Sequence, residues 1–253
     1  MNLENAKKEF EIFVQQYDLE YPKMKRKLKH SYRVMENTGK IAKSLNLNEE
    51  EIEIAKIIGL LHDIGHFETI QIKDILKEDR KIDHGDYGVE ILQKDNYIRR
   101  FIDQDKYDNI IFKAIKNHNK FKIEEGLSEE ELLYAKIIRD ADKLDIFYEG
   151  VEMFWTKPEE IEEVNNSKLS NKVVEAFNNN ILIDRKDVLT KADGILSFIG
   201  FVFDINFKYD FEVLKKEDYI NRILNKFRFK DKTTLNQMNQ VRRTINEYIE
   251  KQL

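Results

Sequence analysis

Apolar side chains recur at helical spacing from one end of the chain to the other, and this pattern constrains the fold more than any other feature. Near the start the spacing is three or four residues, at Ala6, Phe10, Phe13, Val14 and Tyr17. Such a stripe predicts an amphipathic helix. Similar stripes continue into the last third, without an alternating strand pattern of useful length. Only 9 Gly and 2 Pro occur in 253 residues, too few for a turn-rich β-sandwich or barrel. We therefore predict an all-α protein.

Short polar signals predict where several helices begin. Pro22 precedes a helix expected over residues 25–44. Capping boxes, in which a polar cap is followed three positions later by Glu, are predicted at Asn48–Glu51 and Ser128–Glu131. The helix after Asn48 is apolar nearly all round, so we expect it at the centre of the fold. A polar loop is expected over residues 77–81.

Composition excludes several classes of protein and of site. The chain has 43 Lys and Arg against 48 Asp and Glu, so it lacks the positive excess of a general nucleic-acid binder. It has no Cys, which excludes disulfides, thiolate-bound metals and thiol nucleophiles. Glu4, Lys7, Lys8 and Glu9 stand where a signal peptide would need an apolar core, so we expect no signal peptide and a cytoplasmic location. Residues 194–203 are too few to cross a membrane, and a buried helix is expected there.

The five histidines of the chain all lie in its first half, at His30, His62, His66, His84 and His118. Taken singly, each is most simply a hydrogen-bonded core residue. Taken together, imidazoles and carboxylates that converge from separate helices are typical of a di-metal site in a helical bundle. His118 extends the apolar stripe of Ile111 and Ala114, so we expect its side chain to face inward.

The order of these residues resembles the HD-domain superfamily of metal-dependent phosphohydrolases, whose signature is H...HD...H...H...D. The members of the signature are His30, His62, Asp63, His84, His118 and Asp142. The local sequence is also similar, in Leu60-Leu61-His62-Asp63-Ile64-Gly65 and Ala141-Asp142-Lys143-Leu144-Asp145. The resemblance covers about residues 25–150. It implies an HD-domain-like helical bundle over residues 1–150, with additional C-terminal helices over residues 151–253. The chain has no linker-like segment, so we expect both parts to form one continuous domain.

The resemblance also implies a set of metal ligands. A first ion would be held by His30, His62, Asp63 and Asp142, and a second by His84 and His118 with Asp63 as the bridge. Two ions are favoured over one. The mixed nitrogen and oxygen donors suit a divalent transition metal, Fe or Mn, better than Mg. Asp140 is the alternative to Asp142 as the last ligand; otherwise it is a solvent-facing charge beside Arg139.

Three further residues are candidates for a direct part in catalysis. His66 is expected as a general acid or a contact to a phosphate oxygen, and the alternative is a ring packed on Phe67. Arg33 and Lys143 are expected to bind substrate phosphate, with Lys120 as a weaker candidate. The alternative for each cation is an ordinary surface ion pair.

The function that the resemblance implies is hydrolysis of a phosphate ester or anhydride in a nucleotide or another small phosphorylated metabolite. The (p)ppGpp branch is disfavoured because two acids do not follow His62-Asp63, and the cyclic di-GMP branch because its Gly-Tyr-Pro signature is missing. The branch that splits diadenosine tetraphosphate stays as a more specific hypothesis. The alternatives are a di-iron oxygenase of the same fold and a non-catalytic, metal-stabilised binding module.

Overall fold

The structure is a computed structural model that describes residues 2–77 and 82–253. Its secondary structure is helical, and no strand occurs in these two ranges. The all-α prediction is therefore confirmed. The chain divides into two compact units, Met1–Asp145 and Ile146–Leu253. The expectation that residues 1–150 and 151–253 form one continuous domain stays a prediction.

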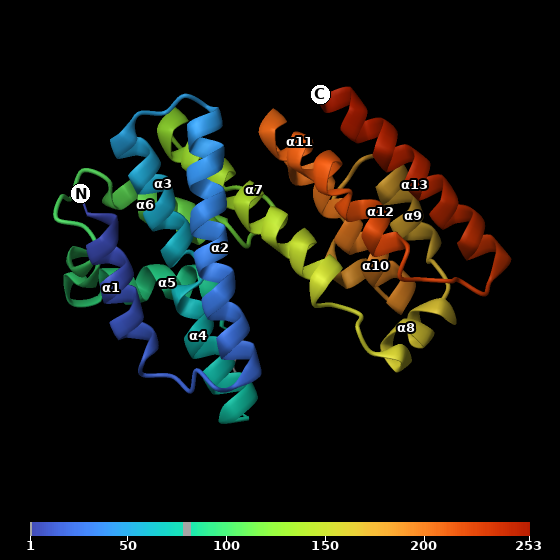
Figure 1. Cartoon of the computed structure of the whole chain (residues 1–253), viewed down its shortest axis with the longest axis horizontal. Coiled ribbons are helices and arrows are strands. Elements are labelled where there is room, and N and C mark those ends of the chain that lie inside the picture. Colours follow the sequence, from blue (N-terminus) through green and yellow to red (C-terminus); the bar gives the residue numbers. More distant parts are fainter. Residues whose placement is uncertain (1, 78–81) are drawn as a thin grey trace. The chain divides into compact units, whose positions relative to one another are not determined.

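The first unit contains the complete set of predicted metal ligands. Its helices are α1 (Leu3–Val14), α2 (Pro22–Ser44), α3 (Glu49–Leu61), α4 (Ile64–Ile70), α5 (His84–Gln93), α6 (Asp108–Asn117) and the first part of α7 (Glu129–Glu152). A π-helical turn follows α4, and a 3₁₀ segment follows α5. Within this unit α2 lies along α3, as Figure 1 shows, and α3 also packs against α1 and α6.

The central position expected for α3 is confirmed. Its buried side chains point to several neighbours rather than to one, and they are Ile54, Ala55, Ile57, Ile58, Leu60 and Leu61. The helix starts at the predicted capping box, because the Asn48 side chain accepts from the main-chain N–H of Glu51 and the Glu51 carboxylate accepts from that of Asn48. The last five residues of α3, 57–61, are all buried, as expected for an apolar segment inside the fold.

The other predicted starts are close to those in the structure. The same reciprocal bonds join Ser128 and Glu131 at the start of α7. Helix α2 begins at Pro22, three residues earlier than expected, since a proline is well tolerated in the first helical turn. The polar loop expected over residues 77–81 falls outside the described residues from position 78 onward.

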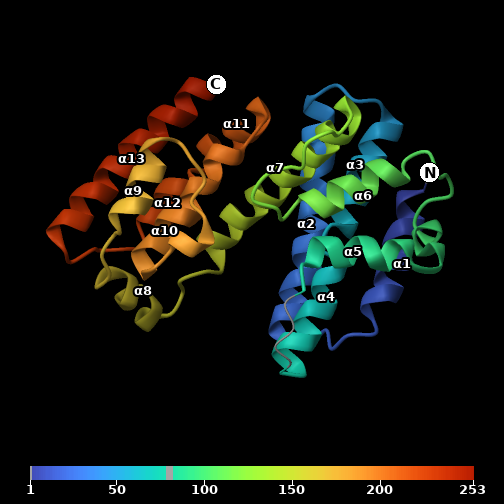
Figure 2. The ribbon, with the colours of Figure 1, turned by 180° about the vertical axis from the view of Figure 1, so that it is seen from behind.

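Helices α4, α5 and α6 form the other side of the first unit. Figure 2 shows α5 between α4 and α6, and it packs against both. At its crossing with α4 the main chains meet at two glycines, Gly65 and Gly88. A Cβ on Gly65 would lie 2.6 Å from the main-chain nitrogen of Gly88. This close approach places the start of α5, and with it His84, beside the start of α4.

The second unit is built from the remainder of α7 and six further helices. These are α8 (Pro158–Asn165), α9 (Asn171–Asn178), α10 (Lys191–Ile199), α11 (Lys208–Glu217), α12 (Tyr219–Leu224) and α13 (Lys232–Gln252). Helix α10 packs on α8 and α9, whereas α13 packs on α9, α11 and α12. The apolar stretch over residues 194–203 lies in α10 and the following 3₁₀ turn, with Ile195, Leu196, Ile199 and Val202 buried. The buried helix predicted there is confirmed.

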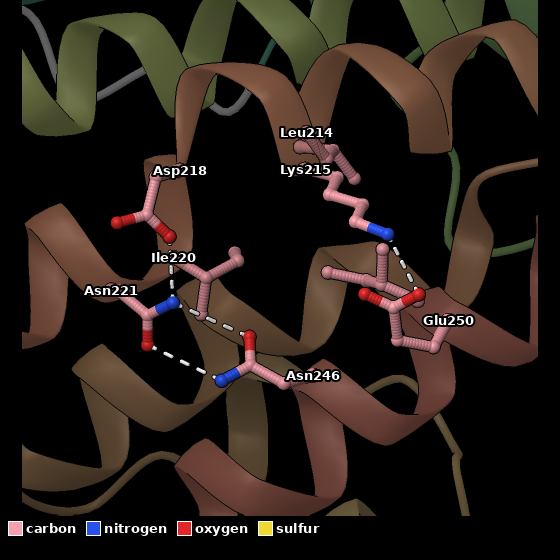
Figure 3. Close-up of a pocket in the computed structure, with 8 residues that line it drawn as sticks. Leu214, Lys215, Asp218, Ile220, Asn221, Asn246 and Glu250 are labelled. Atoms are coloured by element: carbon pink, nitrogen blue, oxygen red, sulfur yellow. Dashed lines mark hydrogen bonds and ion pairs between the residues drawn. The ribbon is translucent and has the colours of Figure 1, made fainter.

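A small hollow of about 240 Å³ lies among α11, α12 and α13 (Figure 3). Its polar side chains bond to one another: Lys215 to Glu250 at 2.7 Å, and Asn221 to Asp218 at 2.6 Å. Since the five histidines lie in the first unit, this hollow is separate from the predicted metal centre. Among the helices that the structure describes, none combines the length and the apolar character required to span a bilayer.

Candidate metal centre

The His62-Asp63 pair lies at the break between α3 and α4. His62 still has helical dihedral angles, whereas Asp63, with φ −104° and ψ 18°, interrupts the helix before α4 begins at Ile64. Both side chains are almost completely buried, because α3 carries them into the interior. A buried carboxylate and a buried imidazole require polar partners or a bound cation.

The other predicted ligands reach the same place from four different helices. His30 lies in the middle of α2, His84 is the first residue of α5, His118 follows the last residue of α6, and Asp142 lies on α7. The structure brings all six predicted ligands into overlapping groups, in each of which the donor atoms lie within 4.8 Å of one another. The groups are His30/His62/Asp63, His62/His118/Asp142 and Asp63/His84/His118.

The carboxylate of Asp63 divides the four histidines into two pairs. Its Oδ2 atom lies 3.4 Å from Nε2 of His30 and 3.2 Å from Nε2 of His62. Its Oδ1 atom lies 3.5 Å from Nε2 of both His84 and His118. One oxygen thus faces each pair. This is the arrangement expected of a carboxylate that bridges two cations.

Asp142 belongs to the first of these pairs. Its Oδ1 atom lies 3.1 Å from Nε2 of His30 and 3.9 Å from Nε2 of His62. Asp140 is completely buried, so its alternative interpretation as a solvent-facing charge is wrong. Among the described residues, the groups of donors that can hold a metal include Asp142 and not Asp140. The geometry therefore favours Asp142 as the acid that faces the first pair.

Hydrogen bonds behind the rings orient three of the histidines. Nδ1 of His62 lies 2.7 Å from the main-chain oxygen of Gly59, and Nδ1 of His118 lies 2.6 Å from that of Ile115. Nδ1 of His30 donates to Oδ2 of Asp145 over 2.6 Å. A proton held at Nδ1 leaves Nε2 as the atom that can bind a cation, and Nε2 is the atom that faces Asp63 in each case.

The buried surroundings shift the pKa values of these groups in different directions. Burial lowers the pKa of His62, and it lowers that of His84 to about 3, so both rings are neutral at pH 7. Burial and the Lys27 charge also lower the pKa of His30, but hydrogen bonds to three carboxylates outweigh them and raise it to about 10. The proton on Nε2 of His30 therefore lies against Asp142, and a bound cation would take the place of this proton.

Two observations indicate that the histidine and aspartate donors of the cluster suit a divalent transition metal. Oδ1 of Asp63 is buried and accepts no hydrogen bond, although a buried carboxylate oxygen normally has a partner. Nε2 of His84 lies 3.2 Å from Nε2 of His118, and Nε2 of His62 lies 3.3 Å from that of His30. Ring nitrogens this close, around an unsatisfied carboxylate oxygen, are well placed for cations. Imidazole with carboxylate suits Fe, Mn or Zn.

The cations expected to bind phosphate have partners within the protein. Arg33 donates through Nε to Oδ1 of Asp145 and through Nη2 to Oδ2 of the same residue, at 2.5 and 2.8 Å. Lys143 donates to the main-chain oxygen of Arg139 at 3.4 Å. Lys120 pairs with two aspartates, Asp83 and Asp86. In these contacts the partners of Arg33, Lys143 and Lys120 are groups other than the carboxylate of Asp63.

His66 does lie beside the cluster, on the first turn of α4. Its ring centroid is 4.6 Å from that of His84. The Thr69 hydroxyl donates to the main-chain oxygen of His66, and Oγ1 lies 3.1 Å from Nδ1 of the ring. Oγ1 can thus accept the Nδ1 proton, so Nε2 keeps its lone pair. Burial lowers the pKa of His66 to about 4, so the ring is neutral at pH 7.

Two residues of the centre were missed from the sequence. Lys27 lies one turn before His30 on α2, and its Nζ atom is 2.6 Å from Oδ2 of Asp63. Asp145 lies one turn after Asp142 on α7 and holds both His30 and Arg33. A spacing of three residues places each of them on the same helix face as a predicted ligand, but it does not identify the distant residue with which each one pairs.

Comparisons with known proteins agree with this geometry. The family model described as HD domain matches residues 28–146, a range that contains the six predicted ligands. No curated protein and no solved structure matches the chain. The predicted all-α bundle, the order of the ligands and the clustered His and Asp donors all conform to that family. The resemblance to the HD-domain family is therefore confirmed over residues 28–146.

Proposed function

We propose that this protein is a metal-dependent phosphohydrolase that hydrolyses a phosphate ester or anhydride of a nucleotide or another small phosphorylated metabolite. The observation that carries the proposal is the position of Asp63 between two pairs of histidines, with one carboxylate oxygen toward each pair. The match of residues 28–146 to the HD-domain family supports the same class of chemistry.

The ligands would be shared between two sites. His30, His62 and Asp142 would hold one ion with Oδ2 of Asp63, and His84 and His118 would hold the other with Oδ1. Divalent ions in such a pair lower the pKa of bound water and neutralise charge on phosphoryl oxygens. The protein contributes fixed donors: three of the four rings are oriented by bonds at Nδ1, so little reorganisation is required when the site is filled.

His66 is the candidate proton acceptor of this centre. Its ring lies against His84, is neutral at pH 7 and has its Nδ1 proton held by Thr69. The lone pair on Nε2 is therefore available to take a proton from an attacking water. This geometry supports a role as base rather than the general-acid role that the sequence suggested.

The test is phosphate release by purified protein loaded with Mn²⁺ or Fe²⁺. The panel contains nucleotides, dinucleotides and cyclic dinucleotides, and ADP formed from diadenosine tetraphosphate identifies the more specific hypothesis. Asp63→Asn should abolish turnover, whereas Asp103→Asn, which changes an exposed aspartate of the same unit, should not. Loaded protein that binds metal but releases no phosphate from any of these compounds would favour the non-catalytic binding module.

The contact between His66 and His84 also favours a second candidate, a di-iron oxygenase of the same fold. Some such enzymes have a histidine after the HD pair at the position of His66, and here the ring centroid of His66 lies 4.6 Å from that of His84. The two candidates differ in their products. Oxygen consumption by iron-loaded protein with a cyclitol or a phosphonate would support the oxygenase, and release of inorganic phosphate without oxygen uptake supports the hydrolase.

A further inference from the structure

Lys27 occupies a distinctive position among the cations of the first unit. Its ammonium lies 2.6 Å from Oδ2 of Asp63, the oxygen that also faces His30 and His62. The Lys27 side chain is 13% exposed, so its stem is packed in the protein while its head reaches the centre. Helical geometry explains this position, because Lys27 is one turn before His30 on α2.

The positive charge of Lys27 lowers the pKa values of histidines on both sides of the Asp63 carboxylate. It contributes to the lowered pKa of His84 and of His66, on the side of the second histidine pair. It also opposes protonation of His30, on the side of the first pair. The ammonium itself lies beside Oδ2 of Asp63, at the edge of the His30 and His62 pair.

The cations first expected to bind phosphate are held elsewhere. The guanidinium of Arg33 is engaged by both oxygens of Asp145, and Lys120 lies between Asp83 and Asp86 at 2.8 and 2.7 Å. Lys143 donates to a main-chain oxygen of its own helix. Lys27, by contrast, pairs directly with the carboxylate of Asp63.

We propose that Lys27 is the residue that binds the phosphoryl oxygens of the substrate, in contact with Oδ2 of Asp63 at the edge of the metal centre. This inference rests on the proposed phosphohydrolase function. An ammonium has three N–H donors, and the bond to Asp63 requires one of them. The remaining donors can bind a phosphate oxygen without loss of the ion pair. Lys27 is thus a fixed positive charge that does not depend on Arg33 or Lys143.

The experiment measures the affinity of inorganic phosphate for the full chain loaded with Mn²⁺, by isothermal titration calorimetry. Lys27→Met should weaken phosphate binding by about tenfold to a hundredfold, the loss expected for one charge-assisted hydrogen bond. Lys27→Arg should retain most of the affinity. Lys25→Met is the matched control: it lies on the same helix, pairs with exposed Glu20 and should bind phosphate as the wild type does.

A second measurement separates binding of phosphate from support of Asp63. Metal content per chain, determined by elemental analysis, should be unchanged in Lys27→Met, because removal of a competing cation does not remove a ligand. Lys27→Gln provides the same readouts if the methionine variant does not fold. In steady-state assays, either variant should raise KM more than Lys25→Met does.

Two results would overturn the inference. Unchanged phosphate affinity in Lys27→Met, together with hydrolysis by the wild type, would reject Lys27 and leave the phosphohydrolase function intact. If Lys27→Met loses bound metal as well as phosphate affinity, the role of Lys27 is only to support Asp63. If the loaded wild type neither binds phosphate nor releases it from any substrate, the proposed function fails, and this inference fails with it.

Discussion

Nδ1 of His30 donates to Oδ2 of Asp145 over 2.6 Å, and this bond joins α2 to α7 behind the candidate metal centre. The same carboxylate accepts two hydrogen bonds from Arg33, one turn after His30. Asp145 is 2% exposed, so its charge depends on these partners. Helix α7 thus supplies two acids with different positions: Asp142 faces the Nε2 side of His30, and Asp145 holds its Nδ1 side.

Asp145→Asn should weaken metal binding although Asp145 faces none of the predicted ions. The substitution removes the charge that orients His30 and that accepts two hydrogen bonds from Arg33. Loss of such an outer carboxylate typically costs about 10- to 100-fold in metal affinity. Titration of metal-stripped protein with Mn²⁺ measures the change, and Asp103→Asn is the control. Equal affinities for the two variants would show that the His30 ring is oriented without Asp145.

Much of the fold was predictable because its signals are local. The bonds between Asn48 and Glu51 form within a single turn, so the residues that make them are visible three positions apart. The burial of residues 57–61 at the end of α3 follows from their lack of polar side chains, which is also a property of a short segment. The boundary between the two units, after Asp145, falls within α7 and near the boundary at residue 150 that the sequence suggested.

The sequence predicted the residues that donate to the metal, but it did not predict the ion pairs that the charged residues of the site form. His30, His62, Asp63, His84, His118 and Asp142 were identified by order, and the structure brings them together. Arg33 was expected to bind substrate, but its partner is Asp145, 112 residues away in sequence. Lys27 was missed because its partner Asp63 is 36 residues away. Ion pairs between distant segments leave no local pattern, so they become visible only in the folded chain.

Two ions per chain are expected, and removal of His118 should leave one. His118→Ala deletes a donor that faces Oδ1 of Asp63, whereas His30, His62 and Asp142 stay in place around Oδ2. Elemental analysis after loading and desalting measures the ratio of metal to protein. A wild type that holds one ion, with the same content in His118→Ala, would mean that His84 and His118 do not form a second site.

His66 should make the metal-stripped protein sensitive to mild acid. Its pKa falls from 6.5 to about 4 on folding, chiefly because of burial. Between these pH values the unfolded chain binds a proton that the folded chain excludes, so the free energy of unfolding decreases as pH falls through this window. By pH 5 the loss from this one ring is on the order of 2 kcal/mol.

The measurement is urea unfolding at pH 7 and pH 5, for the wild type and for His66→Gln. The variant has no titrating ring at position 66, so its stability should fall less between the two pH values. The other histidines are present in both proteins, so their contributions to the loss of stability cancel when the two losses are compared. A wild type and a variant that lose the same stability would place the pKa of His66 near its ordinary value.

Gly65→Ala should destabilise the first unit and displace His84. A Cβ at Gly65 would collide with the main-chain oxygen of His84 and lie 2.6 Å from the main-chain nitrogen of Gly88. Main-chain atoms of α5 cannot move aside as a flexible side chain can, so the two helices must separate. Overpacking of this kind typically costs about 1–3 kcal/mol. Since His84 begins α5, metal affinity should fall as well.

Gly194→Ala is the matched control, because the same change is made inside a helix without a neighbour. No atom lies within 4 Å of a Cβ built on Gly194 in α10. Alanine is favoured over glycine in a helix interior by up to about 1 kcal/mol, so this variant should be slightly more stable than the wild type. Urea unfolding and Mn²⁺ titration of both variants test the pair. If Gly65→Ala matches Gly194→Ala in both measurements, the contact between α4 and α5 does not position His84.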